Sequence, residues 1–220
     1  MKKSFLVILL LILFLSLNGL SCSWFGSNTT EEVAEKTTTE ATPESDLPAT
    51  NLTNVDGTSL DDLVTTNYNL GKSKAQDWQT DAVLVNVTVK LPKNLAYKQA
   101  TETYIFGSAS DSANWFSFSI SEQSSKYIRA IIPKEDYLGT DIKPINSTYW
   151  KMNYLKAFQL AEDNGGKTFR SANSDAEIVC TLANMDPKGW LWWKVEYKSA
   201  STGKSLVIQA NPNDNTVIDA

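Results

Sequence analysis

The stretch Gly189-Trp190-Leu191-Trp192-Trp193-Lys194-Val195-Glu196-Tyr197 holds three of the seven tryptophans and decides how the C-terminal half can fold. Side chains alternate between two faces along a β-strand, so these residues divide into two sets. One set is Leu191, Trp193, Val195 and Tyr197, and the other is Trp190, Trp192, Lys194 and Glu196. The first set is aromatic, aliphatic and β-branched, as expected for the inner face of a half-buried strand.

Periodicity elsewhere predicts an α+β fold, in which an antiparallel sheet carries helices packed on one face. Further strands are expected at 83–90, 104–106, 115–120, 128–132, 176–182 and 206–210. In the 115–132 hairpin the residues expected to face inward are Phe116, Phe118, Ile120, Ile128, Ala130 and Ile132. A long helix is expected over 147–164, capped by Ser147 or Thr148 and ended by Gly165-Gly166, and a shorter one over 72–80.

The two halves of this region indicate a repeat of a helix followed by β-strands, over about 70–139 and 147–220. Asp81-Ala82 follows the first helix, and Asp175-Ala176 follows the second. The pattern Trp115–Ile120 aligns with Trp192–Tyr197, with inward positions on inward positions. The repeat predicts one duplicated unit within a single domain.

A helix, a strand and a tryptophan-led hairpin ending at Ala210-Asn211-Pro212-Asn213-Asp214 resemble the PepSY-type domains of bacterial envelope proteins. The resemblance covers about 147–220, with a diverged copy over 70–139. At the final turn this chain has Asn211–Asn215 where the family usually shows a Thr-Gly pair. The resemblance implies an α+β fold and a role in binding or restraining other envelope proteins, including peptidases, without catalytic residues of its own.

Residues 1–21 are predicted to be a signal peptide. Lys2 and Lys3 precede an apolar run from Phe5 to Leu15, which is too short for a membrane span of about 20 residues. Ser21 before Cys22 resembles a bacterial lipoprotein signal, which implies a lipidated, palmitate-bearing Cys22 and a membrane-anchored envelope protein facing the periplasm or exterior. Ordinary cleavage nearby and an uncleaved short anchor are the alternatives.

The composition changes twice after this leader. Residues 22–57 are rich in Ser, Thr and Glu and have little to bury, so we expect a disordered tether after the lipidated cysteine. Residues 58–220 carry the apolar periodicity and are expected to form the globular domain.

Charge and composition exclude several classes of function. The net charge is −5, which argues against nucleic acid as a partner. The chain has no histidine, which removes the commonest general base, the Ser-His and Cys-His pairs and imidazole metal ligation. Its two cysteines, Cys22 and Cys180, are too few for a zinc site, and we expect no metal or cofactor.

The candidate binding residues are aromatic rings predicted to point away from the core. Trp190 and Trp192, with Lys194 beside them, share the outer face of their strand, and Trp115 has the same position on another strand. Exposed tryptophans are able to stack on a sugar, a peptide or a partner chain. The alternative is that the long helix or the rest of the sheet covers this face.

Acidic residues provide the competing interpretation. Carboxylates occur in or beside predicted turns at Asp111, Glu122, Glu135, Asp136, Asp163 and Asp214. No spacing selects a catalytic pair, and Asp214 among asparagines is a poor calcium ligand set. The sequence therefore predicts a non-catalytic, membrane-anchored module that binds another envelope protein or peptide through its sheet. The alternative is a carboxylate-dependent envelope hydrolase.

Overall fold

The computed structural model describes residues 62–93, 95–137, 142–185 and 188–219. The predicted signal peptide, Cys22 and the whole of the predicted tether lie outside these ranges. Among the helices that are described, none is both long and apolar enough to cross a membrane.

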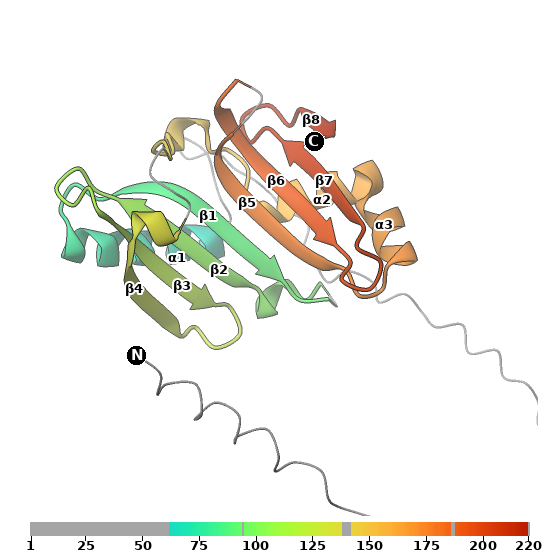
Figure 1. The fold of residues 1–220 in the computed structure, drawn as a ribbon, viewed down its shortest axis with the longest axis horizontal. Helices are drawn as coiled ribbons and strands as arrows, with labels where there is room; N and C mark the ends of the chain where they lie inside the picture. Colours follow the sequence, from blue (N-terminus) through green and yellow to red (C-terminus); the bar gives the residue numbers. More distant parts are fainter. Residues whose placement is uncertain (1–61, 94, 138–141, 186–187, 220) are drawn as a thin grey trace, which may run out of the picture. The chain divides into compact units, whose positions relative to one another are not determined.

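The described residues form an eight-stranded antiparallel sheet (Figure 1). Its order is β4-β3-β2-β1-β5-β6-β7-β8, so the sheet grows outward in both directions from the central β1–β5 pair. The strands are β1 (Val83–Leu91), β2 (Thr101–Gly107), β3 (Asn114–Ser121), β4 (Tyr127–Pro133), β5 (Glu177–Met185), β6 (Trp190–Lys198), β7 (Ser205–Ala210) and β8 (Val217–Asp219).

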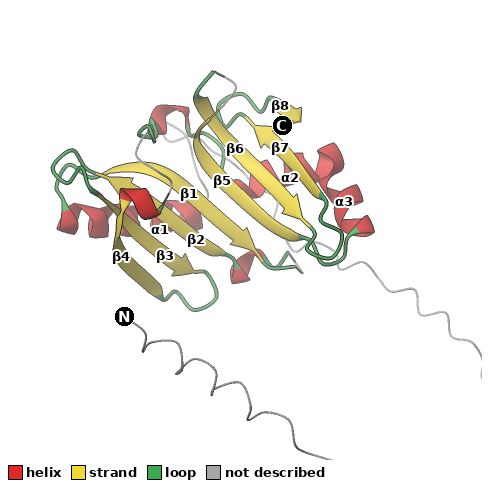
Figure 2. Cartoon of the chain, viewed as in Figure 1, coloured by secondary structure: helices red, strands yellow, loops and turns green. Residues whose placement is uncertain are grey.

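The helices pack on one face of this sheet, here called the helix face (Figure 2). They are α1 (Asp62–Trp78), α2 (Tyr154–Ala161) and α3 (Lys167–Ala172). Short helical turns occur in the connections, namely η2 (Tyr97–Gln99), η3 (Lys134–Asp136), η4 (Ser147–Tyr149) and η5 (Glu162–Gly166). Helix α1 lies against β2 and β3, and α2 lies against β5, β6 and β7. The predicted α+β class, an antiparallel sheet with helices on one face, is confirmed.

Helix α1 is longer than the predicted 72–80 segment. Its buried positions, Val64, Asn67, Gly71 and Ala75, recur at helical spacing and face the sheet. A Cβ at Gly71 would lie 2.9 Å from Phe118 Cδ1, so glycine allows the close approach of helix and strand here. The sequence also suggested an N-cap and first turn at 59–63, most of which lies outside the described residues, but no helix was predicted over 64–71. Asparagine and glycine are poor helix formers, and tertiary packing overrides that preference here.

The predicted 147–164 helix is interrupted at both ends. Helix α2 begins only at Tyr154, and its cap is Asn153, whose Oδ1 accepts the Lys156 N–H at 3.0 Å. Capping by Ser147 or Thr148 was therefore a wrong prediction. Gly165, at a φ of +112°, breaks the helix as expected, but the chain then turns into α3 rather than ending there.

The start of α2 is fixed to the sheet through one backbone carbonyl. The indole Nε1–H of Trp193 donates to Met152 O at 2.7 Å, and that of Trp150 donates to the same oxygen at 3.0 Å. A carbonyl has two lone pairs, so it can accept both bonds. All three residues are buried, and the two indole rings meet edge to face at 6.5 Å.

A β-bulge in β1 explains a break in the alternation of that strand. The register with β2 shifts between Leu84 and Asn86. Leu84 and Val87 therefore both belong to the main core on the helix face, while Val85 joins Ile105 and Trp115 in a small core on the opposite face.

The inward face predicted for β4 is wrong by one residue. Ile131 pairs with Phe116 and Arg129 with Phe118, so these positions, and not Ile128, Ala130 and Ile132, share the helix face. Ile128 is 75 % exposed. Strand β4 is an edge strand that pairs only with β3, so burial did not set its pattern.

Truncation of two tryptophans in this stretch should distinguish a core position from a surface position. Trp193 is fully buried and Trp190 is 51 % exposed. We expect Trp193→Ala to lower the free energy of unfolding by about 3–5 kcal/mol. Trp190→Ala should lower it by less than about 1 kcal/mol. Chemical denaturation of both variants measures this, and equal losses would contradict the assignment of Trp190 to the surface.

Candidate functional site

Trp115, a predicted binding residue, is buried on the face opposite the helices. It is 2 % exposed and packs with Val85 and Ile105, and its Nε1–H donates to Tyr137 O at 2.9 Å. Lys134 Nζ lies 4.3 Å from the centre of the Trp115 ring. Alternation gave the face of Trp115 correctly, but the chain after β4 covers that face. The ring is therefore not available as an exposed platform.

Trp192 was also expected to offer an exposed ring, and that interpretation is wrong because it is only 3 % exposed. Alternation tells which face a side chain points to, but not whether that face is covered. Lys194, on the same face, is one-third exposed and pairs with Glu196 at 3.1 Å. Trp115 lies on β3, four strand positions from β6, at about 19 Å for strands about 4.8 Å apart. The four predicted residues therefore do not form one site.

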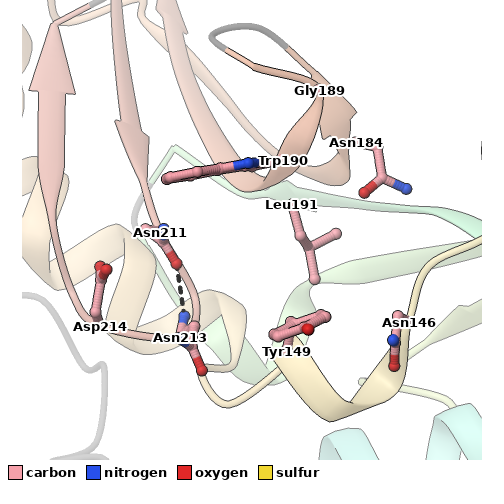
Figure 3. A pocket seen from close by; sticks show the side chains of 9 residues that line it. All are labelled: Asn146, Tyr149, Asn184, Gly189, Trp190, Leu191, Asn211, Asn213 and Asp214. Carbon is pink, nitrogen blue, oxygen red and sulfur yellow. Dashed lines mark hydrogen bonds between the residues drawn. The ribbon is translucent and has the colours of Figure 1, made fainter.

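Trp190 is the predicted residue that does line a pocket, at the end of the sheet where β6 begins (Figure 3). The pocket has a volume of about 580 Å³, within the range of small-molecule sites. Its lining residues are Asn146, Tyr149, Asn184, Gly189, Trp190, Leu191, Asn211, Asn213 and Asp214. They come from the 142–149 segment, the end of β5, the start of β6 and the β7–β8 turn.

Two exposed aromatic rings belong to this pocket. Trp190 is 51 % exposed and Tyr149 is 54 % exposed. Gly189, at a φ of +62°, follows Lys188 at +70°, and these left-handed residues lead the chain into β6 at Trp190. Lys188 Nζ lies 4.5 Å from the centre of the Trp190 ring and favours its orientation by a cation–π contact.

The polar lining is held by hydrogen bonds within the protein. Asn211 Oδ1 accepts Asn213 N–H at 2.9 Å, a bond drawn in Figure 3. Asn146 Oδ1 accepts Thr148 N–H at 3.0 Å, and Asn184 Nδ2 donates to Lys143 O and Pro144 O at 3.2 and 3.0 Å.

The two sides of the pocket are also joined to each other. Lys151 N–H donates to Pro212 O at 3.2 Å, which links the segment after η4 to the β7–β8 turn. These bonds fix the pocket before any ligand binds.

No pattern in the sequence indicated Tyr149, Asn146 or Asn184 as residues of this pocket. Asn146 was a turn residue before the predicted helix, and Asn184 closes a strand; they share one pocket only because of the β4-to-α2 connection. A sequence signal existed for the Asn211–Asn215 turn, whose four polar residues were considered only as calcium ligands. Asp214 Oδ1 is used to accept Thr216 N–H at 2.9 Å.

The competing interpretation required two carboxylates in one cleft. Of the described acids, Glu122 approaches Glu102, and Asn67 Nδ2 donates to both, at 3.2 Å to Glu102 Oε2. Tyr104 O–H donates to the same Glu102 oxygen at 2.5 Å. Glu102 is fully buried beneath α1, where no substrate reaches it. Asp111 and Asp214 instead accept hydrogen bonds within their own turns.

The environment of Glu102 makes its protonation depend on folding. Burial, and secondarily the nearby Glu122 carboxylate, raise the pKa of Glu102 to about 8, although hydrogen bonds from Tyr104 and Asn67 act in the other direction. The group is therefore neutral at pH 7 in the folded chain. A neutral acid can share this buried position with polar partners without the cost of an unpaired charge.

Stability should fall with rising pH because of this residue. The folded-state pKa lies above the ordinary value of 4.5, so the stabilisation is complete below about pH 4.5 and is lost as pH rises to about 8. In Glu102→Gln this loss should disappear, and the difference in unfolding free energy between variant and wild type should change by about 1.4 kcal/mol per pH unit across this range.

Urea denaturation from pH 5 to 9 measures this difference. Glu135→Gln, in the exposed turn after β4, is the control and should follow the wild-type profile. Parallel profiles for wild type and Glu102→Gln would show that Glu102 is not held neutral by folding.

Comparison with protein-family models, with curated proteins and with solved structures found no match to this chain. The resemblance to PepSY-type domains therefore stays a prediction from the sequence pattern. The function has to be argued from the geometry of the chain itself.

Proposed function

We propose that this protein is a non-catalytic binding module, anchored to the membrane of the cell envelope, that holds its ligand in the Trp190 pocket. The observation that carries the proposal is the exposure of two aromatic rings, Trp190 and Tyr149, around one hollow with a fixed polar lining. Such rings contribute much of the binding energy at protein surfaces. The expected partner, another envelope protein or peptide, has to reach this end of the sheet rather than the covered Trp192 or Trp115.

The same proposal includes a duplicated α+β unit, in a different alignment from the one predicted. Asp81 accepts hydrogen bonds from Ser108 Oγ at 2.5 Å and Ser110 N–H at 3.0 Å. Asp175 accepts them in the same way from Ser199 Oγ at 2.7 Å and Ser201 N–H at 2.8 Å. Both serine pairs flank an alanine in the turn after the second strand of their half.

Those hydrogen bonds lower the pKa of Asp81, chiefly through the Ser108 hydroxyl, and that of Asp175 to about 2, chiefly through Ser201 N–H. The two aspartates thus have matching chemistry as well as matching positions. This supports an equivalence of β1 with β5 and of β2 with β6.

The strand registers support the same equivalence. Val83 pairs with Gly107, next to Ser108, and Glu177 pairs with Lys198, next to Ser199. The last turns also agree, because Ser121 N–H donates to Lys126 O, and Asn211 N–H donates to Thr216 O. The tryptophan strand β6 therefore corresponds to β2, and the alignment of Trp192–Tyr197 with Trp115–Ile120 is replaced.

The pocket does not follow this repeat, which supports a functional origin for it. Leu191 and Trp190 lie beyond the part of β6 that β2 matches, and the 142–149 segment belongs to the connection between the two halves. A feature present at one end only is not required by the shared fold.

A binding experiment tests the proposed site. The immobilised chain is incubated with solubilised envelope material from the cells that express it, and the retained material is compared between variants. We expect Trp190→Ala to retain at most about one-tenth of the wild-type amount, since tenfold corresponds to about 1.4 kcal/mol. Tyr127→Ala, which removes a 43 % exposed ring on β4, should retain the full amount. Equal retention by wild type and Trp190→Ala would contradict the assignment of the site.

The membrane anchor has its own test. If Cys22 carries the lipid, Cys22→Ala should move the protein from the membrane fraction to the soluble fraction, because the acyl chains supply the apolar surface that holds a lipoprotein at the membrane. Fractionation with immunoblotting and the mass of the N-terminal peptide measure this. Membrane retention of Cys22→Ala, with no lipid mass on the wild-type peptide, would contradict lipidation.

A further inference from the structure

We propose that the ligand of the Trp190 pocket is a neutral saccharide, whose ring faces stack on Trp190 and Tyr149 while its hydroxyls bond to the asparagine lining. This rests on the proposed function for the binding site, and it replaces the protein or peptide partner expected from the sequence with a saccharide. The argument uses the aromatic surfaces, the polar atoms left over after the internal hydrogen bonds, and the charge of the lining.

The aromatic surfaces favour a ligand with flat carbon–hydrogen faces. Trp190 and Tyr149 each expose about half of their surface, and both line the same hollow (Figure 3). Their polarised π-faces are negative, so they attract hydrogens bound to carbon as well as cations. Leu191, the aliphatic residue of the lining, is 7 % exposed and offers no deep apolar slot for a hydrophobic side chain.

The polar atoms that remain are both donors and acceptors. Asn146 and Asn211 use Oδ1 internally, which leaves their Nδ2 groups as donors. Asn184 uses Nδ2 internally, which leaves its Oδ1 as an acceptor, whereas the Asp214 carboxylate is bonded by both the N–H and the side chain of Thr216. Within the described part of the chain, these remaining atoms have no hydrogen-bond partner. Hydroxyl groups donate and accept at once, so they match such a mixed set.

The charge of the lining argues against anionic ligands. Asp214 is the one charged residue that lines the pocket, and the remaining lining consists of amides, aromatic rings, leucine and glycine. Lys188 Nζ lies 4.5 Å from the centre of the Trp190 ring and makes a cation–π contact with it. Lys143 Nζ, at 4.0 Å from a Cβ placed on Gly189, is a second cation close to the lining, but neither lysine is a lining residue. An anionic ligand would face the Asp214 carboxylate, whereas an uncharged polyol meets no such repulsion.

A peptide fits the same lining less well. An extended peptide gains most of its affinity from backbone bonds to an exposed strand edge, together with pockets for alternate side chains. The pocket lies instead at the ends of strands that are paired on both sides, since β5, β6 and β7 each have two neighbours. The available hydrogen bonds therefore come from side chains spaced around a hollow, as hydroxyls are spaced around a sugar ring.

The test measures binding of neutral oligosaccharides to the full chain in a detergent whose headgroup is not a sugar. Binding to a glycan array of neutral and acidic saccharides first identifies which saccharide to use as the probe. The neutral saccharide that binds best is then titrated into protein labelled with ¹⁵N-tryptophan. The indole signal of Trp190 is identified by its loss in Trp190→Phe, which keeps an aromatic ring. We expect this signal to shift on titration, and Trp190→Ala and Tyr149→Ala each to weaken binding about tenfold or more.

Two controls make the outcome specific. Tyr127→Ala, outside the pocket, should bind the saccharide as wild type does. A matched uncharged peptide rich in serine and asparagine should leave the Trp190 signal unchanged.

The outcomes separate this inference from the proposed function. No binding to any neutral saccharide on the array, or binding that is equal in wild type and Trp190→Ala, overturns the saccharide assignment. If envelope protein or peptide is retained in a Trp190-dependent way while saccharides are not, the binding module stands and the ligand class fails. If nothing bound depends on Trp190, both proposals fail.

Discussion

The two indole hydrogen bonds to the carbonyl of Met152 fix the part of the structure on which the pocket depends. Trp150 and Trp193 are far apart in sequence, and each buries a polar N–H that has to find a partner. Sharing one oxygen satisfies both and holds the start of α2 against β6. The η4 turn with Tyr149 directly precedes this point, and Trp190 lies at the start of β6. One buried carbonyl therefore fixes the positions of the two segments that carry the exposed rings.

The symmetry of the sheet explains why a pocket forms at this place. Strands run outward in both directions from the β1–β5 pair, so the connection from β4 has to cross the sheet to reach α2. On its way it covers Trp115 through Tyr137 and Ile142, and Ile145 N–H then bonds to Leu84 O at 2.8 Å. The segment that follows meets the β7–β8 turn and the start of β6. The segment that connects β4 to α2 thus provides part of the lining, and the strands β5, β6 and β7 with their turns provide the rest.

The buried carboxylate pair and the pocket have different physical characters. Glu102 is buried, neutral at pH 7 and accepts a hydrogen bond from Asn67 of α1. Its hydrogen bonds therefore hold the helix against the sheet. The asparagines of the pocket are exposed or half-exposed, except for Asn211, and each keeps one atom available. Buried polar groups that bond to one another, as Glu102 Oε2 does to Tyr104 and Asn67, help to specify a fold. Preorganised groups at the surface are able to recognise a ligand.

The sequence by itself determined the α+β class, the positions of most strands and the inner faces of β3, β5, β6 and β7. Alternation and turn residues act locally, so they are readable without the fold. The parity of β4 was predicted wrongly because an edge strand is not constrained by burial on both sides. The 64–71 part of α1 was not predicted, because Asn67 and Gly71 are there for packing against Glu102 and Phe118 and not for helix propensity.

Only the tertiary structure decided which tryptophans are available to a ligand. Trp190, Trp192 and Trp115 have the same outward parity, yet exposure separates them, since Trp190 is half-exposed and the others are buried. What covers a face comes from segments distant in sequence, as the bond from Trp115 to Tyr137 shows. The same holds for Tyr149, Asn146 and Asn184, which join Trp190 through chain crossings that no local pattern encodes. Periodicity gives direction along a strand, whereas accessibility depends on the packing of the whole chain.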